Sequence, residues 1–223
     1  MMKVKRFRRH GRMGGWCGLL AAWVAALGLT ACMEAAVLRD GDLIFQANED
    51  GGFVDAIEHV TDGVWSHVGI IRLLPDGIHV LEATPGQGVV LTPLDDFLEG
   101  SAHDAEGRAV VRVFRIRDLS PDEISAAIAR AEACLGRPYD KGFAPGTEAL
   151  YCSELVYESF RRANGDPVFS AVPMTFKGPD GETAPYWIRY YERLGSPVLE
   201  GVPGTNPNAL SREDVLIPVP WPS

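Results

Sequence analysis

The sequence predicts an α+β fold in which an antiparallel sheet packs against helices. Two runs of apolar and β-branched residues, 64–73 and 78–84, flank Leu-Pro-Asp-Gly at 74–77, a pattern typical of a β-hairpin. Two later segments carry helix signals. A capping box with proline at the first helical position begins at Ser120, and 150–163 has an apolar stripe at helical spacing. The expected order of strand, helix, strands, helix, helix is typical of an α+β domain.

The remaining elements follow from the same patterns. In chain order we expect a strand at 42–46, a short amphipathic helix at 53–60, a third strand at 88–92, a helical turn at 94–98 and a strand at 109–116. From about residue 170 prolines and glycines punctuate the chain, so we expect an irregular extension wrapped on the core. The aromatic residues at 186–191 fit either the border of a cleft or the outside of the core, and we favour the core.

His67 and Glu82 form the first candidate pair. If the hairpin is centred near Leu74 and Pro75, the two residues lie directly opposite each other, with Cβ atoms roughly 4.5–5.5 Å apart. A carboxylate beside a histidine holds one ring nitrogen and leaves the other free for a thiol. The alternative is that Glu82 is an ordinary exposed strand residue. The pairing depends on register, because a one-residue slip places the side chains on opposite faces.

Cys152 is the candidate nucleophile. It lies in the first turn of the helix expected at 150–163, after a loop rich in glycine and proline. Unpaired backbone N–H groups and the helix dipole favour a thiolate there. The same N–H groups stabilise an oxyanion during acyl transfer. The alternative is a buried structural cysteine.

Cys134 lacks this context. It follows apolar residues at helical spacing along the helix that begins at Ser120, so we interpret it as a core residue. A disulfide between Cys134 and Cys152 is formally possible in an oxidising compartment, but it would block the nucleophile, and we predict that both thiols are free. No cysteine pair or second histidine stands at zinc-ligand spacing, so we expect no metal and no cofactor.

Five short motifs, taken in order, resemble a known family. They are GDLIFQ at 41–46, SHVGI at 66–70, LEA at 81–83, PYD at 138–140 and YCSELV at 151–156. Together they resemble the YiiX/YaeF-like permuted papain-like amidases, circularly permuted relatives of the NlpC cell-wall endopeptidases. The resemblance covers residues from about 41 to 163. It implies a circularly permuted papain-like fold and a thiol hydrolase acting on an amide, with Cys152 as nucleophile, His67 as base and Glu82 as third member.

The amino terminus has the features of a bacterial lipoprotein signal peptide. Residues 1–12 include six lysines and arginines, 16–31 are apolar, and Leu-Thr-Ala-Cys at 29–32 resembles a lipobox. The apolar run is too short to span a membrane. We therefore expect removal of residues 1–31 and lipidation of Cys32, the alternatives being an ordinary signal peptide or an uncleaved anchor. Because Met33 rather than aspartate follows, we expect the outer membrane, facing the periplasm, if the source is Gram-negative.

The mature chain, 32–223, suits a single domain. It is 192 residues long, which is enough for one full core. Loss of the six basic residues changes the formal net charge from −9 to −15. A nucleic-acid surface needs clustered lysine and arginine, so we expect no nucleic-acid partner.

Three functions fit these residues. We favour a membrane-anchored cysteine amidase or peptidase whose partner is an amide or peptide substrate, such as one derived from peptidoglycan. The second is a thiol acyltransferase or lipid hydrolase, because relatives of lecithin:retinol acyltransferase share the order of histidine before cysteine. The third is an envelope-binding lipoprotein whose site is inactive.

Overall fold

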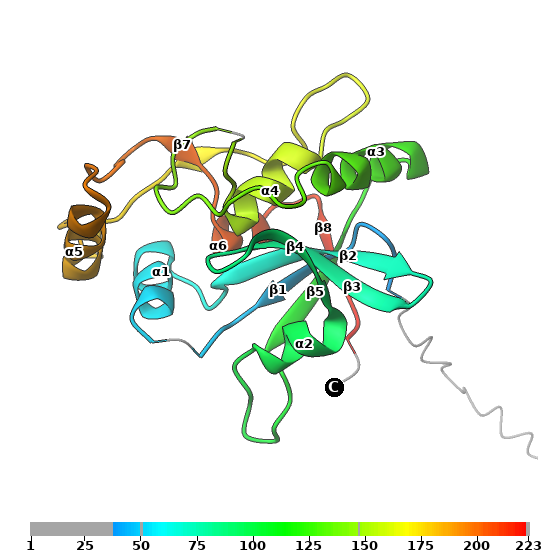
Figure 1. Ribbon diagram of the computed structural model, residues 1–223, viewed down its shortest axis with the longest axis horizontal. Helices are drawn as coiled ribbons and strands as arrows, with labels where there is room; N and C mark the ends of the chain where they lie inside the picture. Colours follow the sequence, from blue (N-terminus) through cyan, green and yellow to red (C-terminus); the bar gives the residue numbers. More distant parts are fainter. Residues whose placement is uncertain (1–37, 50, 147, 222–223) are drawn as a thin grey trace, which may run out of the picture. The chain divides into compact units, whose positions relative to one another are not determined.

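The computed structural model describes residues 38–49, 51–146 and 148–221, and its centre is a six-stranded antiparallel sheet (Figure 1). The strand order is β4-β3-β2-β1-β5-β8. The strands are β1 (Leu43–Gln46), β2 (His67–Leu74), β3 (Gly77–Thr84), β4 (Gly88–Pro93), β5 (Val111–Ile116) and β8 (Leu216–Val219). The predicted α+β class and its antiparallel sheet are confirmed.

Helices cover both faces of the sheet (Figure 1). One face packs against α4 (Cys152–Ser159), which in turn packs against α3 (Pro121–Glu132). The other face carries α2 (Leu94–Glu99) over β3 and β4. Side chains alternate between the faces as strand geometry requires: Leu43 and Ile70 are buried on the α4 face, whereas Ile44 and Ile71 are buried with Phe97 on the α2 face.

The β2–β3 hairpin has a different register from the expected one. Leu74 pairs with Gly77 and Ile70 with Leu81, so the turn is centred on Pro75 and Asp76. The prediction that His67 lies directly opposite Glu82 is therefore wrong by two residues. Because side chains alternate with a period of two, a two-residue shift keeps both on one face, where they are diagonal neighbours.

The two helices expected near Ser120 and at 150–163 are both present, but the second is shorter than expected. The capping box predicted at Ser120 is present, with the Ser120 hydroxyl and the Glu123 carboxylate bonded to each other's backbone N–H. Helix α4 ends at Ser159 rather than 163, because Phe160 has an extended backbone and Arg161 begins a bridge to Pro167.

The segment after residue 170 contains more regular structure than expected. It forms β6 (Val172–Pro173), α5 (Pro185–Leu194), β7 (Pro203–Gly204), α6 (Pro207–Ser211) and β8. Two of the prolines that suggested irregularity, Pro185 and Pro207, stand at the first position of α5 and α6, where the missing N–H costs no hydrogen bond. Strand β8 extends the central sheet by pairing with β5.

Helix α1 (Phe53–Thr61) packs with α5 beside the sheet. Within the described part of the chain, every helix is too short or too polar to cross a bilayer. The predicted signal peptide and the lipidation site Cys32 lie outside the described residues.

Candidate active site

His67 and Glu82 form a buried pair at the end of the sheet. His67 Nε2 lies 2.5 Å from Glu82 Oε2, and the two residues are 9 % and 5 % exposed. His67 is the first residue of β2, so its ring stands where the strand begins and other elements can reach it. Since Nε2 faces the carboxylate, Nδ1 is the ring nitrogen left for another partner.

Two residues that the sequence did not reveal hold this pair. The Thr92 hydroxyl donates to Glu82 Oε1, so both carboxylate oxygens have a donor. The Phe97 ring lies 5.8 Å from the His67 ring, centroid to centroid, and covers it from α2. The signal for Thr92 is its register: it pairs with Val80, two residues before Glu82, and therefore shares its face.

Cys152 reaches the pair from the opposite layer. It is the first residue of α4, and its side chain is 5 % exposed. Burial lowers the pKa of His67, but the charge and hydrogen bond of Cys152 together with Glu82 raise that pKa to about 10. The raised pKa means that His67 favours the charged imidazolium at neutral pH. The structure brings together all three residues singled out in the sequence.

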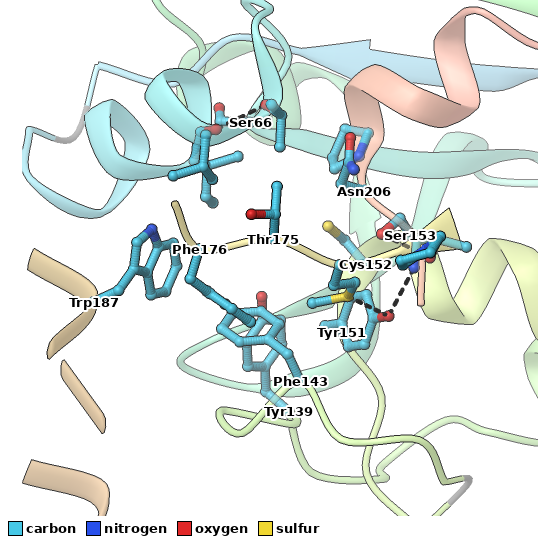
Figure 2. Close-up of a pocket in the computed structure, with 17 residues that line it drawn as sticks. Ser66, Tyr139, Phe143, Tyr151, Cys152, Ser153, Thr175, Phe176, Trp187 and Asn206 are labelled. Carbon is cyan, nitrogen blue, oxygen red and sulfur yellow. Dashed lines mark hydrogen bonds between the residues drawn. The ribbon is translucent and has the colours of Figure 1, made fainter. Parts of the chain in front are cut away.

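A largely apolar pocket opens in front of Cys152 (Figure 2). It occupies about 630 Å³, including space open to solvent. Figure 2 shows the Cys152 sulfur directed into it, across from Phe176 and Trp187. Its other apolar lining residues include Ile57, Val60, Phe143 and Met174. His67 and Glu82 line an adjoining cleft, and Ser66 and Tyr139 line both.

Tyr139 and Trp187 show how distant segments build this pocket. Burial, followed by the charge of Cys152, raises the pKa of Tyr139 well above its usual value, so the phenol stays a neutral donor. Trp187 comes from α5 and is 2 % exposed, so it both packs in an aromatic cluster and lines the pocket. The two roles considered for the aromatic residues at 186–191, cleft border and core packing, therefore both apply to Trp187.

Cys134 is not part of the site. It lies just beyond the end of α3, is half-buried against the core, and its thiol donates to the Arg130 carbonyl at 3.4 Å. Both it and Cys152 are free thiols.

The profile of the permuted papain-like amidase enzyme family, YaeF/YiiX, C92, matches residues 37–219. The chain belongs to this family. The family and the permuted papain-like fold inferred from the five motifs are confirmed, and membership supports a cysteine hydrolase of the amidase class.

Two relatives are similar to this chain over part of its length. The uncharacterized protein YiiX of Escherichia coli K12 is 32 % identical over 128 residues, which are 57 % of this chain and 59 % of that protein. Protein OPG091 of Monkeypox virus is 32 % identical over 110 residues, 48 % of this chain and 58 % of that protein. The chain thus spans just under three fifths of each of these relatives.

A solved member has the same fold. The crystal structure of metalloprotein yiiX from Escherichia coli O157:H7 superposes with a TM-score of 0.66 at 25 % identity, covering 82 % of this chain and 98 % of that one. Within the described ranges of this chain, no three His, Cys, Asp or Glu side chains are grouped so that they could hold a metal ion. We therefore assign no metal to the site.

Proposed function

We propose that the protein hydrolyses an amide with Cys152 as nucleophile, His67 as acid and base, and Glu82 as the group that orients His67. The observation that carries this proposal is the buried 2.5 Å contact between His67 and Glu82 beside a cysteine at a helix N-terminus. This is the arrangement of nucleophile, base and orienting group that thiol catalysis needs. Family membership supports the same reaction class.

The charge state of the pair sets the order of proton transfers. The Cys152 thiolate attacks the amide carbonyl carbon, a C–S bond forms, and negative charge moves to the carbonyl oxygen. His67 imidazolium then gives its proton to the nitrogen as the C–N bond breaks, leaving a thioester and a free amine. Neutral His67 takes a proton from water, the resulting hydroxide attacks the thioester, and release of the carboxylic acid restores thiolate and imidazolium.

The start of α4 supplies stabilisation for the oxyanion. Tyr151 at the N-cap makes no side-chain cap hydrogen bond, so backbone N–H groups of the first turn remain available beside the thiol. Such preorganised donors are worth roughly 10²–10³-fold each in acyl-transfer enzymes. The neutral Tyr139 hydroxyl, directed into the same pocket in Figure 2, is a further donor.

The lining of the pocket favours an apolar acyl group. Aromatic and aliphatic side chains surround the sulfur, whereas a peptidoglycan peptide carries several charges that these walls would desolvate. An N-acyl amide with an apolar acyl chain is therefore our first choice of substrate. The same observation favours, as a second candidate, the lipid hydrolase or acyltransferase reaction over cell-wall peptide cleavage.

The test is product analysis by mass spectrometry on matched amides and esters that carry either apolar acyl chains or charged peptides. We expect the apolar amide to be cleaved fastest, with a transient acyl adduct on Cys152. Faster ester cleavage or acyl transfer to an added amine would select the second candidate. If neither turnover nor an adduct is detected, the third hypothesis, an envelope-binding lipoprotein with an inactive site, would replace both reactions.

We also propose that the mature protein begins at a lipidated Cys32 and is anchored in the outer membrane, facing the periplasm. The lipobox at 29–32 supports this placement. Acyl chains contribute roughly 0.8 kcal/mol per buried CH₂, and more than one chain gives stable anchoring. A Cys32→Ala variant should accumulate unprocessed or lose membrane association in fractionated cells. Normal processing and retention of that variant would reject the proposal.

A further inference from the structure

A second pocket lies beside the start of α4, separate from the one that holds Cys152. Its lining includes Gly146, Glu154, Tyr157, Glu158, Ala171 and Pro203. Tyr151 and Thr205 line both pockets and form the wall between them. The mechanism proposed above makes no use of this second pocket.

Glu154 is the unusual residue in it. The residue is 6 % exposed, and its Oε2 is a buried atom with no hydrogen-bond partner. The carboxylate does interact with the backbone N–H groups of Tyr151 and Gly146, which is a structural role at the third position of the helix. That role leaves Oε2 unexplained, and an unpaired buried carboxylate oxygen is costly unless a donor occupies the pocket.

The surroundings of Glu154 are acidic and apolar. Burial, followed by the charge of Asp140, raises the pKa of Glu154 to about 8, and Glu158 acts in the same direction. No lysine or arginine is among the described residues that line the pocket. Arg161, the nearby cation, is held by Glu158 at 2.6 Å and lies over the Tyr157 ring at 4.9 Å. The described residues that line this pocket therefore supply no cationic donor to Glu154 Oε2.

We propose that this pocket binds a primary alkylammonium group, with Glu154 Oε2 as its acceptor. A single free oxygen suits one N–H of an ammonium, whereas a guanidinium is best bound by both oxygens of a carboxylate. The walls from Pro145, Ala171 and Pro203 suit an alkyl stem rather than a hydrated ion. No group of three metal-ligating side chains occurs in the described residues, which argues against a divalent cation.

The chemistry fits two sources, a free alkylamine and a lysine side chain of a peptide. The inference goes beyond the proposed function and does not rest on it. Its test is a binding measurement, so the outcome is independent of whether Cys152 catalyses hydrolysis.

The experiment is calorimetric titration of the full-length protein with n-butylamine hydrochloride at pH 8, with n-butanol as the uncharged control. We expect saturable binding of the ammonium and none of the alcohol. Glu154→Gln should weaken binding about ten- to hundredfold, the range for losing a hydrogen bond to a charged group. Glu158→Gln, which removes a charge from another residue that lines the pocket, should change the affinity for butylammonium less than about threefold. If Nα-acetyl-lysine amide binds as tightly as butylamine, the source is a lysine side chain. If it binds clearly more weakly, the source is a free amine.

A second measurement keeps the proposal testable if Glu154→Gln does not fold. Titration of the Glu154 carboxyl by ¹³C NMR should give a midpoint near 8 that falls when butylammonium is saturating. Binding should strengthen from pH 6 to 9 as Glu154 loses its proton, while Tyr151, whose pKa burial raises to about 12, stays neutral. Asp140, Glu158 and Tyr157 also face this carboxyl, so the Glu158→Gln control is titrated in parallel. Equal binding of alcohol and ammonium, or an unmoved midpoint, would overturn the proposal.

Discussion

Of the two cysteines in the described part of the chain, the more buried one is the one expected to react faster. Cys152 is 5 % exposed, whereas Cys134 is only half-buried. Cys152 stands at the positive end of α4 and interacts with a charged His67. Cys134 lies past the negative end of α3 and donates to a carbonyl. The comparison teaches that local charge, rather than exposure, is what should select the nucleophile.

The largest expected effect separates the two cysteines by activity. Cys152→Ser should lower the rate of amide hydrolysis by at least about 10³-fold, because a hydroxyl is far harder to deprotonate than a thiol. Cys134→Ser, the matched control, should retain the wild-type rate. Both variants are assayed on the apolar amide after their thermal transitions are compared. Substantial activity in Cys152→Ser would remove the distinction between the two thiols.

His67→Ala should have the next largest effect. Loss of the proton carrier typically costs about 10²–10⁴-fold in rate. Glu82→Gln should cost less, because the amide oxygen still accepts from the ring while the charge that stabilises imidazolium is lost. The measurement is kcat/KM for both variants. A Glu82→Gln enzyme as fast as wild type would reduce Glu82 to a structural residue.

The pH dependence of His67 sharpens the same comparison. Its raised pKa of about 10 means that the folded protein favours the charged ring. The associated stability is fully present below the unfolded value of about 6.5 and is lost as pH rises through about 10. In Cys152→Ala the contribution of Cys152 to the raised pKa of His67 is absent, so the His67 titration midpoint measured by NMR should fall. An unchanged midpoint would show that Cys152 does not interact with the ring.

The smallest expected effect concerns Thr92. Thr92→Val keeps the shape but removes the hydroxyl that donates to Glu82 Oε1. We expect a loss of about three- to tenfold in kcat, consistent with one hydrogen bond worth about 1 kcal/mol. The same variant assayed in a Glu82→Gln background should show little further loss, because the two residues act through one carboxylate. If the losses in kcat of the two single variants multiply in the double variant, Thr92 does not act through Glu82.

Local patterns in the sequence were enough to predict five of the six strands of the sheet, the start of α3 and the three residues that the structure brings together. The hairpin shows why the detail was harder. Leu-Pro-Asp-Gly admits more than one two-residue turn, and the choice of Pro75 and Asp76 as its centre moved Glu82 by two places. His67 and Glu82 still share a face because side chains alternate with a period of two. The prediction of the pair was therefore correct about the face and wrong about the register.

Tertiary packing accounts for what the sequence did not reveal. Trp187 lies in α5, 35 residues after Cys152, yet both line one pocket. No local pattern encodes such an approach. Glu154 lies two residues after Cys152 in the first turn of α4, and only the packing of distant segments such as Pro203 against it makes it a buried carboxylate.

Competitive alkylation tests the central claim most directly. Folded protein is treated with iodoacetamide near pH 6, where an ordinary thiol with a pKa of about 8.5 is almost wholly protonated, and labelling of the two peptides is followed by mass spectrometry. We predict that Cys152 is labelled at least about tenfold faster than the more exposed Cys134, and that His67→Ala removes this difference. Equal rates in the wild-type protein, or faster labelling of Cys134, would contradict the assignment of Cys152 as an activated nucleophile.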